Sequence, residues 1–303
     1  MLNKETHALV SIIIPCYNHG SFLSKAIQSV FEQNYNEIEI IVVDDGSTDN
    51  TREVALSYQT VTYLYQENRG LSAARNAGIK VSKGAFLIFL DADDWFLPDA
   101  INLNINYLHS DEKLAFVSGG HIKVFDNNKI ITEKQEIQNH HFENLLRGNY
   151  IGMHAAVMYR RWVFDEFLFD ETLSNCEDYD LYLKIARLYP VSHHMHLIAA
   201  YRFHHSNMSG NIPAMLKGVL NILERQNKVV KNPIESSALA NGKKIWIEYY
   251  CRELYKGLLI KKIEFNEKVF ETLLNYKPVL LLKYFLKKIL DVKTTHSKVS
   301  TSL

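Results

Sequence analysis

The feature that most constrains this 303-residue chain is a regular alternation, in its first third, between short apolar runs and amphipathic stretches. The apolar runs are rich in β-branched or aromatic residues and have the length of strands: Val10–Pro15, Ile38–Val43, Val61–Tyr65 and Phe86–Leu90. The stretches between them predict helices that begin at Gly20-Ser21, with Ser21 as the N-cap, after Asp49, at Leu71 (ending near Val81) and near Pro98. This alternation predicts an α/β fold with a mostly parallel sheet covered by helices on both faces.

In the remaining two thirds of the chain, the sequence pattern changes once, from mixed strands and helices to helices alone. A hairpin turn is predicted at Asp126-Asn127-Asn128, a helix over Tyr179–Leu188 and a strand over Met195–Phe203. After Pro213 the sequence carries long helical patterns. We therefore expect an α/β body over residues 1–211 and a C-terminal helical extension over residues 212–303.

Charge and cysteine usage exclude several classes of protein. Lys+Arg and Asp+Glu number 34 each, so the basic surplus of a nucleic-acid-binding protein is missing. The three cysteines are widely spaced and form no CxxC pair, which disfavours a disulfide framework and a cysteine zinc site. The first residues lack a signal-peptide cleavage pattern, and no apolar run approaches the ~20 residues of a membrane span. We expect a cytoplasmic protein.

Ligands of parallel α/β sheets bind at the carboxyl ends of the strands, which directs attention to the residues after Pro15, Val43 and Leu90. Asp44 and Asp45 follow the second of these strands and lead into a Gly-Ser-Thr turn. Such a turn can be an ordinary strand-to-helix connection. Its position at the ligand-binding edge favours a binding site.

A second acidic cluster, Asp91, Asp93 and Asp94, follows the strand that ends at Leu90. Three neighbouring carboxylates repel one another unless a cation neutralises them. Oxygen ligands suit a hard divalent ion such as Mg²⁺ or Mn²⁺, and such an ion bridges to phosphate oxygens. The alternative is a solvated acidic turn that caps the next helix.

Two further clusters lie later in the chain. Glu177 and Asp178 begin a predicted helix, where they are either an ordinary charged first turn or hold a general base, a role for which Asp180 competes. A strand that ends at Arg202, His204 and His205 supplies imidazole for a metal and a cation for a phosphate, although histidines at strand ends are more often structural.

Common nucleotide-binding and hydrolase motifs are absent from the sequence. It contains no GxGxxG after the first strand, no GxxxxGK[ST] and no GxSxG. This disfavours a Rossmann dehydrogenase, a P-loop NTPase and an α/β-hydrolase. A diphosphate would have to be held by a metal ion rather than by a glycine-rich loop.

Six segments between Val10 and Ser209 together resemble the family 2 glycosyltransferases, whose catalytic domain has the GT-A fold. They occur in the family's order and at its usual separations: VSIIIPCYN, VVDDGSTDN, ENRGLSAARNAG, FLDADD, FDETLSNCEDYDLYLKIA and YRFHHSNMS. The resemblance implies that residues 1–211 form a GT-A catalytic domain. One departure is Phe167-Leu168, where relatives often have Gly-Gly, and it puts the acceptor side in question.

The resemblance also implies roles for individual residues. Asp178 matches the catalytic base, with Glu177 beside it, and Asp93 and His204 match the metal ligands. The positions implied for nucleotide-sugar binding are Pro15, Tyr17, Asp45, Asn68, Arg75, Asp91 and Ala92. Pro15 and Asp45 would border the nucleobase, and Asp91 would approach the ribose or the metal.

The implied activity is an inverting, Mn²⁺- or Mg²⁺-dependent transfer from a nucleotide-sugar, a UDP-sugar by this interpretation, to a glycan or lipid-linked glycan acceptor in surface polysaccharide synthesis. A sugar nucleotidyltransferase is an alternative, but Pro15–His19 supplies no glycine-rich phosphate loop. A non-catalytic nucleotide- or glycan-binding module is another, and loss of an acidic cluster would have favoured it. Val279–Leu290, with its lysines, either packs against the body or makes peripheral contact with an acidic membrane surface.

Overall fold

The structure is a computed structural model that describes residues 8–204 and 207–299, with side chains as far as residue 290. The chain divides into two compact units, Met1–Ser206 and Asn207–Leu303. The boundary expected from the sequence, at residue 211, lies a few residues beyond this division.

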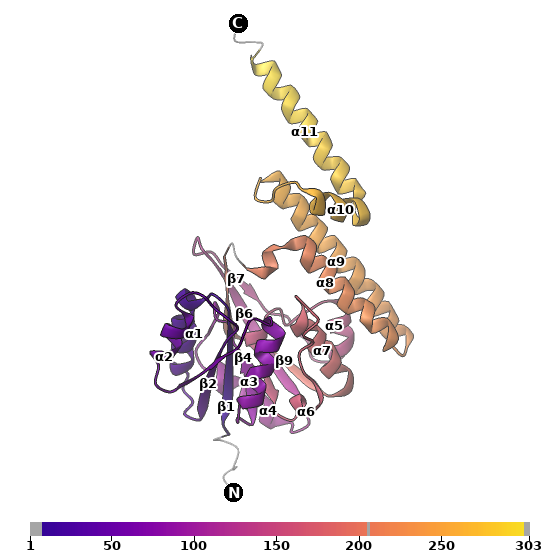
Figure 1. Cartoon of the computed structure of the whole chain (residues 1–303). Coiled ribbons are helices and arrows are strands. Elements are labelled where there is room, and N and C mark those ends of the chain that lie inside the picture. The colour runs from indigo at the N-terminus through magenta and orange to yellow at the C-terminus, as the bar shows by residue number, and fades with distance from the viewer. Residues whose placement is uncertain (1–7, 205–206, 300–303) are drawn as a thin grey trace. The chain divides into compact units, whose positions relative to one another are not determined.

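The described part of the N-terminal unit alternates strands and helices (Figure 1). Its strands are β1 (Val10–Cys16), β2 (Ile38–Asp44), β3 (Val61–Tyr65), β4 (Phe86–Phe89), β5 (Trp95–Phe96), β6 (Phe116–Phe125), β7 (Ile130–Glu133), β8 (Val157–Arg160) and β9 (Val191–Phe203). Its helices are α1 (Gly20–Phe31), α2 (Thr51–Leu56), α3 (Leu71–Val81), α4 (Ala100–Ser110), α5 (His141–Arg147), the 3-10 turn η1 (His154–Ala156), α6 (Val163–Glu166) and α7 (Glu177–Leu188).

The strands form one sheet in the order β3-β2-β1-β4-β8-β6-β9-β5, with β7 paired to β6. The neighbours β3, β2, β1 and β4 are parallel, as their apolar runs predict. The other half is mixed, because β4, β8 and β6 pair antiparallel, β6 and β9 pair parallel, and β9 and β5 pair antiparallel. The predicted hairpin is confirmed as β6–β7.

Strand β1 is buried on both faces, which explains its continuous apolar sequence. Ile12 and Ile14 belong to the core that also contains the apolar faces of α1 and α4. Ile13 faces α3 on the other side, where a Cβ on Gly78 would lie only 2.4 Å from Ile13 Cγ2. Glycine therefore lets α3 lie close to the sheet, and it brings Arg75 and Asn76 of the same helix into buried positions.

Several element boundaries differ from the prediction. Helix α1 begins at Gly20 rather than after Ser21, because the Gly20 N–H donates to Asp49 Oδ2 at 2.9 Å and no side chain of the helix's own start caps it. Strand β9 begins at Val191 rather than Met195, and two of the histidines that disguise its alternation each have one polar contact with a neighbouring element. His194 Nε2 lies 3.0 Å from Asn104 Oδ1, and His193 Nδ1 lies 2.8 Å from Ser118 Oγ.

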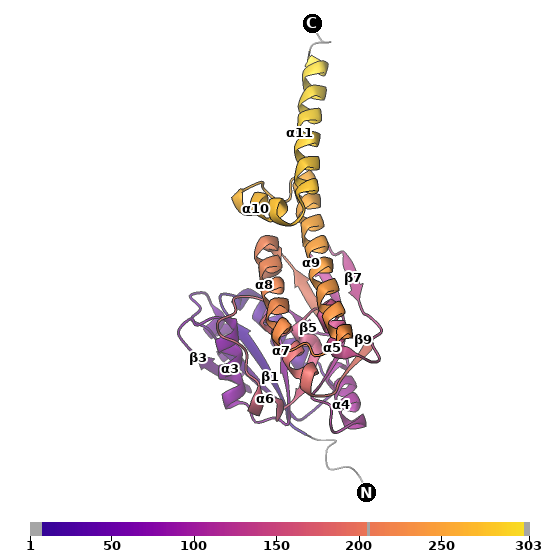
Figure 2. The same ribbon diagram turned by 90° about the vertical axis from the view of Figure 1, so that its right-hand side faces the viewer.

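The described part of the C-terminal unit, residues 207–299, consists of helices and the short segments that join them (Figure 2). Its elements are η2 (Met208–Gly210), α8 (Ile212–Arg225), η3 (Gln226–Lys228), α9 (Pro233–Leu259), α10 (Glu267–Tyr276) and α11 (Pro278–Val299). Asn211, Asn232 and Asn266 each cap the next helix through the side-chain oxygen, as Asn does at an N-cap. None of the helices within residues 8–204 and 207–299 has both the length and the apolar character needed to cross a membrane.

Candidate active site

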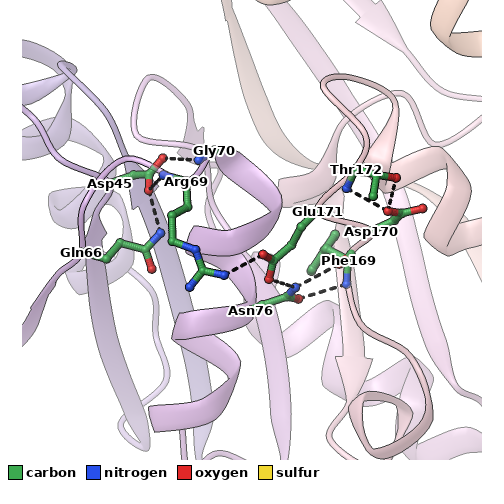
Figure 3. A network of polar contacts seen from close by, with 9 residues as sticks. All are labelled: Asp45, Gln66, Arg69, Gly70, Asn76, Phe169, Asp170, Glu171 and Thr172. Atoms are coloured by element: carbon green, nitrogen blue, oxygen red, sulfur yellow. Dashed lines mark hydrogen bonds and ion pairs between the residues drawn. The ribbon is translucent and has the colours of Figure 1, made fainter.

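The two aspartates at the end of β2 hold the local structure. Asp44 accepts hydrogen bonds from Ser47 N and Tyr63 Oη at 2.8 and 2.7 Å. Asp45 accepts from Gln66 Nε2, Arg69 N and Gly70 N at 2.6, 2.9 and 2.8 Å, and so fixes the start of α3 (Figure 3). These three hydrogen bonds therefore hold Asp45 rigidly at the carboxyl end of β2. Its role at a nucleobase stays a prediction.

The acidic cluster after β4 has a separate partner for each carboxylate. Asp91 Oδ1 accepts from Arg75 at 2.8 Å, and Asp93 Oδ2 lies 3.0 Å from His204 Nε2. Asp94 is buried and accepts from Arg202 N at 2.9 Å, while burial and the charges of Asp93 and Asp91 raise its pKa well above the ordinary range. The chain itself thus offsets part of the repulsion that the sequence suggests.

Arg75 joins this cluster to the first turn of α7. Its side chain is only 2% exposed, and its guanidinium contacts Glu177 Oε1 at 2.6 Å and Asp91 Oδ1 at 2.8 Å. The sequence identified all three residues but missed that Arg75 bridges the two acidic groups. The available signal was the run of small residues around Arg75, which indicates a helix face that lies close to the sheet.

Asp178 follows Glu177 at the start of α7 and has an unusual electrostatic environment. Burial first, and then the charge of Glu177, raise the pKa of Asp178 to about 7, whereas Arg75 opposes the rise. The charge of Asp91 contributes as well, so the two carboxylates lie within electrostatic range of each other. A carboxylate with a pKa near neutrality has the property required of a general base. Asp180, its competitor, is paired with Lys184 at 2.5 Å.

A polar network connects α3 to the loop that precedes α7 (Figure 3). Asn76 donates to Phe169 O and accepts from Phe169 N, both at 3.0 Å, and so binds the loop as a neighbouring strand would. Asn76 also donates to Glu171 at 3.2 Å, and Arg69 donates to Glu171 at 2.9 Å. The loop contains Leu168, whose side chain is 48% exposed.

The other sequence-predicted residues lie at the same edge with different exposure. Pro15 is buried in β1, and Ala92 is buried after β4. Tyr17 and Asn68 are exposed, on the loops that follow β1 and β3. His205 lies outside the described residues. The fold therefore gathers these positions at the carboxyl ends of β1, β2, β3 and β4, as the sheet rule requires.

Asp93 and His204 are a suitable pair of protein ligands for a divalent cation. They supply one carboxylate oxygen and one imidazole nitrogen, and their 3.0 Å contact shows that both point to the same place. Over residues 8–204 and 207–299, no group of three or more His, Cys, Asp or Glu side chains is arranged to hold a metal. A cation held here would take its remaining ligands from water or from a bound diphosphate.

The fold and the site define a glycosyltransferase of the GT-A type, and comparison with known proteins agrees. The sequence profile of glycosyl transferase family 2 matches residues 11–168, so the chain belongs to this family. It is 33% identical over 245 residues to an uncharacterized glycosyltransferase of Rickettsia typhi, which covers 76% of this chain and 77% of that protein. It is 30% identical over 189 residues to a chondroitin synthase of Escherichia coli, covering 61% of this chain and 27% of the synthase.

Solved structures share the fold at low sequence identity. The chain matches S. aureus TarS 1-349 in complex with UDP-GlcNAc with a TM-score of 0.65 and 17% identity, over 88% of this chain and 80% of that one. It matches a Pyrobaculum calidifontis mannosyltransferase in complex with GDP-Man and Mn²⁺ with a TM-score of 0.61 and 17% identity, over 94% and 88%. The chain spans about a third of the length of the first curated relatives, for instance 32% of one from Rickettsia bellii.

We expect Arg75→Met to lower the free energy of unfolding by about 3 kcal/mol, because it leaves Glu177 buried and Asp91 half-buried without their cation. The matched control is Arg69→Met, which breaks an ion pair whose side chains are 62% and 42% exposed. It should cost at most about 1 kcal/mol. Urea denaturation of the two variants measures the difference. Equal losses would show that Arg75 is no more important to stability than a surface arginine.

Proposed function

We propose that this chain transfers a sugar from a UDP-sugar to a hydroxyl group of a glycan or lipid-linked glycan, in the synthesis of a surface polysaccharide. The observation that carries the proposal is the meeting, at one sheet edge, of the Asp93–His204 pair with Asp178, whose carboxylate has a pKa of about 7. Family membership supports it, as do fold neighbours that bind UDP-GlcNAc or GDP-Man.

Donor binding is assigned to the loops after β1, β2, β3 and β4. Pro15 and Asp45 border the nucleobase, and Asp91 approaches the ribose or the metal. The other residues assigned to this site are Tyr17, Asn68, Arg75 and Ala92. Because Arg75 is buried and engaged by two carboxylates, we assign it to holding Asp91 in place rather than to direct contact with the nucleotide.

Asp93 and His204 are assigned to a divalent cation, Mn²⁺ or Mg²⁺. A cation held by these two residues would neutralise negative charge that develops on the leaving diphosphate. Arg202 supports this position, because its Nε donates to the backbone carbonyl of Asp93 at 2.9 Å and its own N–H holds Asp94.

Asp178 is assigned the role of general base. It takes the proton of the acceptor hydroxyl, which attacks the anomeric carbon from the face opposite the leaving group, so one displacement inverts that carbon. Glu177 and Arg75 position this base, because their ion pair fixes the first turn of α7 against the end of β4. A non-catalytic binding module would not need a carboxylate with a pKa near neutrality, and this favours the enzyme.

We expect Asp178→Asn to lower turnover by about 10²–10⁴-fold while nucleotide binding is retained, because the amide cannot accept the acceptor's proton. Asp180→Asn is the matched control. This variant removes a carboxylate that lies in the same helical turn and is paired with Lys184. Its turnover should stay within about tenfold of that of the original chain. Assays of sugar transfer and of UDP binding test both variants. Retained turnover in Asp178→Asn would exclude this residue as the base.

The reaction rate should rise with pH, because the general base must be ionised to act. Asp178 acts only when ionised, and its pKa is about 7. The ratio kcat/KM should therefore fall about tenfold for each pH unit below about 7 and level off above it. A profile that stays level through this range would contradict the assignment, as would one that falls as the pH rises.

We expect excess chelator to abolish activity, and Mn²⁺ or Mg²⁺ to restore it. Asp93→Asn should weaken Mn²⁺ binding, measured by electron paramagnetic resonance without any turnover, because a carboxylate ligand is replaced by a neutral amide. Asp126→Asn, which changes an exposed aspartate in the β6–β7 turn, is the control and should bind Mn²⁺ normally. Full activity in excess chelator would reject the metal's role.

Thermal unfolding can test which nucleobase the donor carries. In the presence of Mn²⁺, UDP should raise the melting temperature more than GDP or dTDP do, because a ligand that binds only the folded state stabilises it, by about 2.7 kcal/mol at 100 times its Kd. A larger rise with GDP or dTDP would overturn the assignment of a UDP-sugar and leave the transferase mechanism untouched.

A further inference from the structure

Helix α11 exposes a continuous strip of large apolar side chains. Six side chains, each between 41% and 62% exposed, form what we call the apolar strip: Val279, Leu282, Phe285, Leu286, Ile289 and Leu290. Their spacing by three, four and seven positions places them on one face of the helix. Leu281 and Tyr284 are buried, and Tyr284 stacks on Phe265 at 5.3 Å. The helix therefore has one packed face and one largely exposed face.

Every charged residue within residues 278–290, the segment that holds the apolar strip, is a lysine. Lys283 and Lys287 are exposed, and by helical position they border one edge of the strip. Lys288 lies over the ring of Tyr284 at 5.7 Å, and no Asp or Glu occurs between residues 278 and 290. A second copy of residues 278–290 would bring lysines against lysines, without an acidic partner from that segment. A surface with negative charge and an apolar interior complements both features.

We propose that the apolar strip of α11 binds the interface of a membrane that contains anionic lipids. The helix lies in the plane of the interface, with the strip among the acyl chains and Lys283 and Lys287 near the phosphates of the headgroups. Over the residues that the structure describes, α11 does not combine the length and the apolar character that crossing a membrane requires. The proposal goes beyond the sugar transfer and does not rest on it, since it concerns residues that take no part in the reaction.

The first experiment is co-sedimentation of the full chain with vesicles of phosphatidylcholine, or of phosphatidylcholine and phosphatidylglycerol in a three-to-one ratio. Leu286→Ser/Ile289→Ser should lower the partition coefficient on the mixed vesicles by about tenfold or more, because it removes apolar area from the interface. The control is Leu56→Ser/Ile130→Ser, whose side chains are 55% and 59% exposed against 51% and 54% in the strip. It should bind like the original chain.

The second experiment separates charge from apolar contact. Lys283→Gln/Lys287→Gln should weaken binding to the mixed vesicles by about tenfold at low salt and remove much of their advantage over neutral vesicles. The control, Lys80→Gln/Lys113→Gln, changes exposed lysines of the N-terminal unit and should not weaken binding to the mixed vesicles. High salt should reduce the preference for anionic lipid.

Three results would overturn the proposal. The first is that the original chain binds neither kind of vesicle. The second is that the variant in Leu286 and Ile289 binds as well as its control. The third is that this variant abolishes a dimer seen by light scattering while vesicle binding is absent, which would assign the strip to a second copy of the chain. All these variants should hydrolyse the donor at the same rate. Failure of the membrane-binding proposal can therefore be told apart from failure of the transferase assignment.

Discussion

The buried guanidinium of Arg75 is the interaction on which the site depends. A cation that is 2% exposed is stable only if carboxylates surround it, and here Asp91 and Glu177 do so at 2.8 and 2.6 Å. These partners come from the end of β4 and the first turn of α7. Arg75 itself lies on α3, which packs close to β1 because residue 78 is glycine. The position of Asp178 follows from this three-way contact.

The acids at this edge are electrostatically distinct although the sequence makes them look alike. Asp91 has an arginine, Asp93 has a histidine, and burial beside charged neighbours raises the pKa of Asp94. Asp178 differs again, since burial and Glu177 bring its pKa to about 7. One cluster can therefore include a cation-binding carboxylate and a base, because each role needs a different charge environment.

Much of the fold was predictable because it rests on local periodicity. The strands β1 to β4 and helix α3 follow from apolar runs and spacing, and the resemblance to family 2 agrees with the profile match. The mixed half of the sheet was less predictable. Strand β9 contains three histidines that interrupt its alternation, one of them buried, and β5 consists of two residues only, with a partner about a hundred positions away.

The sequence by itself determined which residues are available for chemistry: two aspartate clusters at strand ends, an acidic pair that begins a helix and a histidine at the end of a strand. Only the tertiary structure decided their partners. The contacts of Arg75 with Glu177, of Asn76 with Phe169 and of Asp93 with His204 each join residues separated by about ninety to a hundred and ten positions. Pairing over such distances depends on the path of the chain through the sheet, and no local pattern encodes that path.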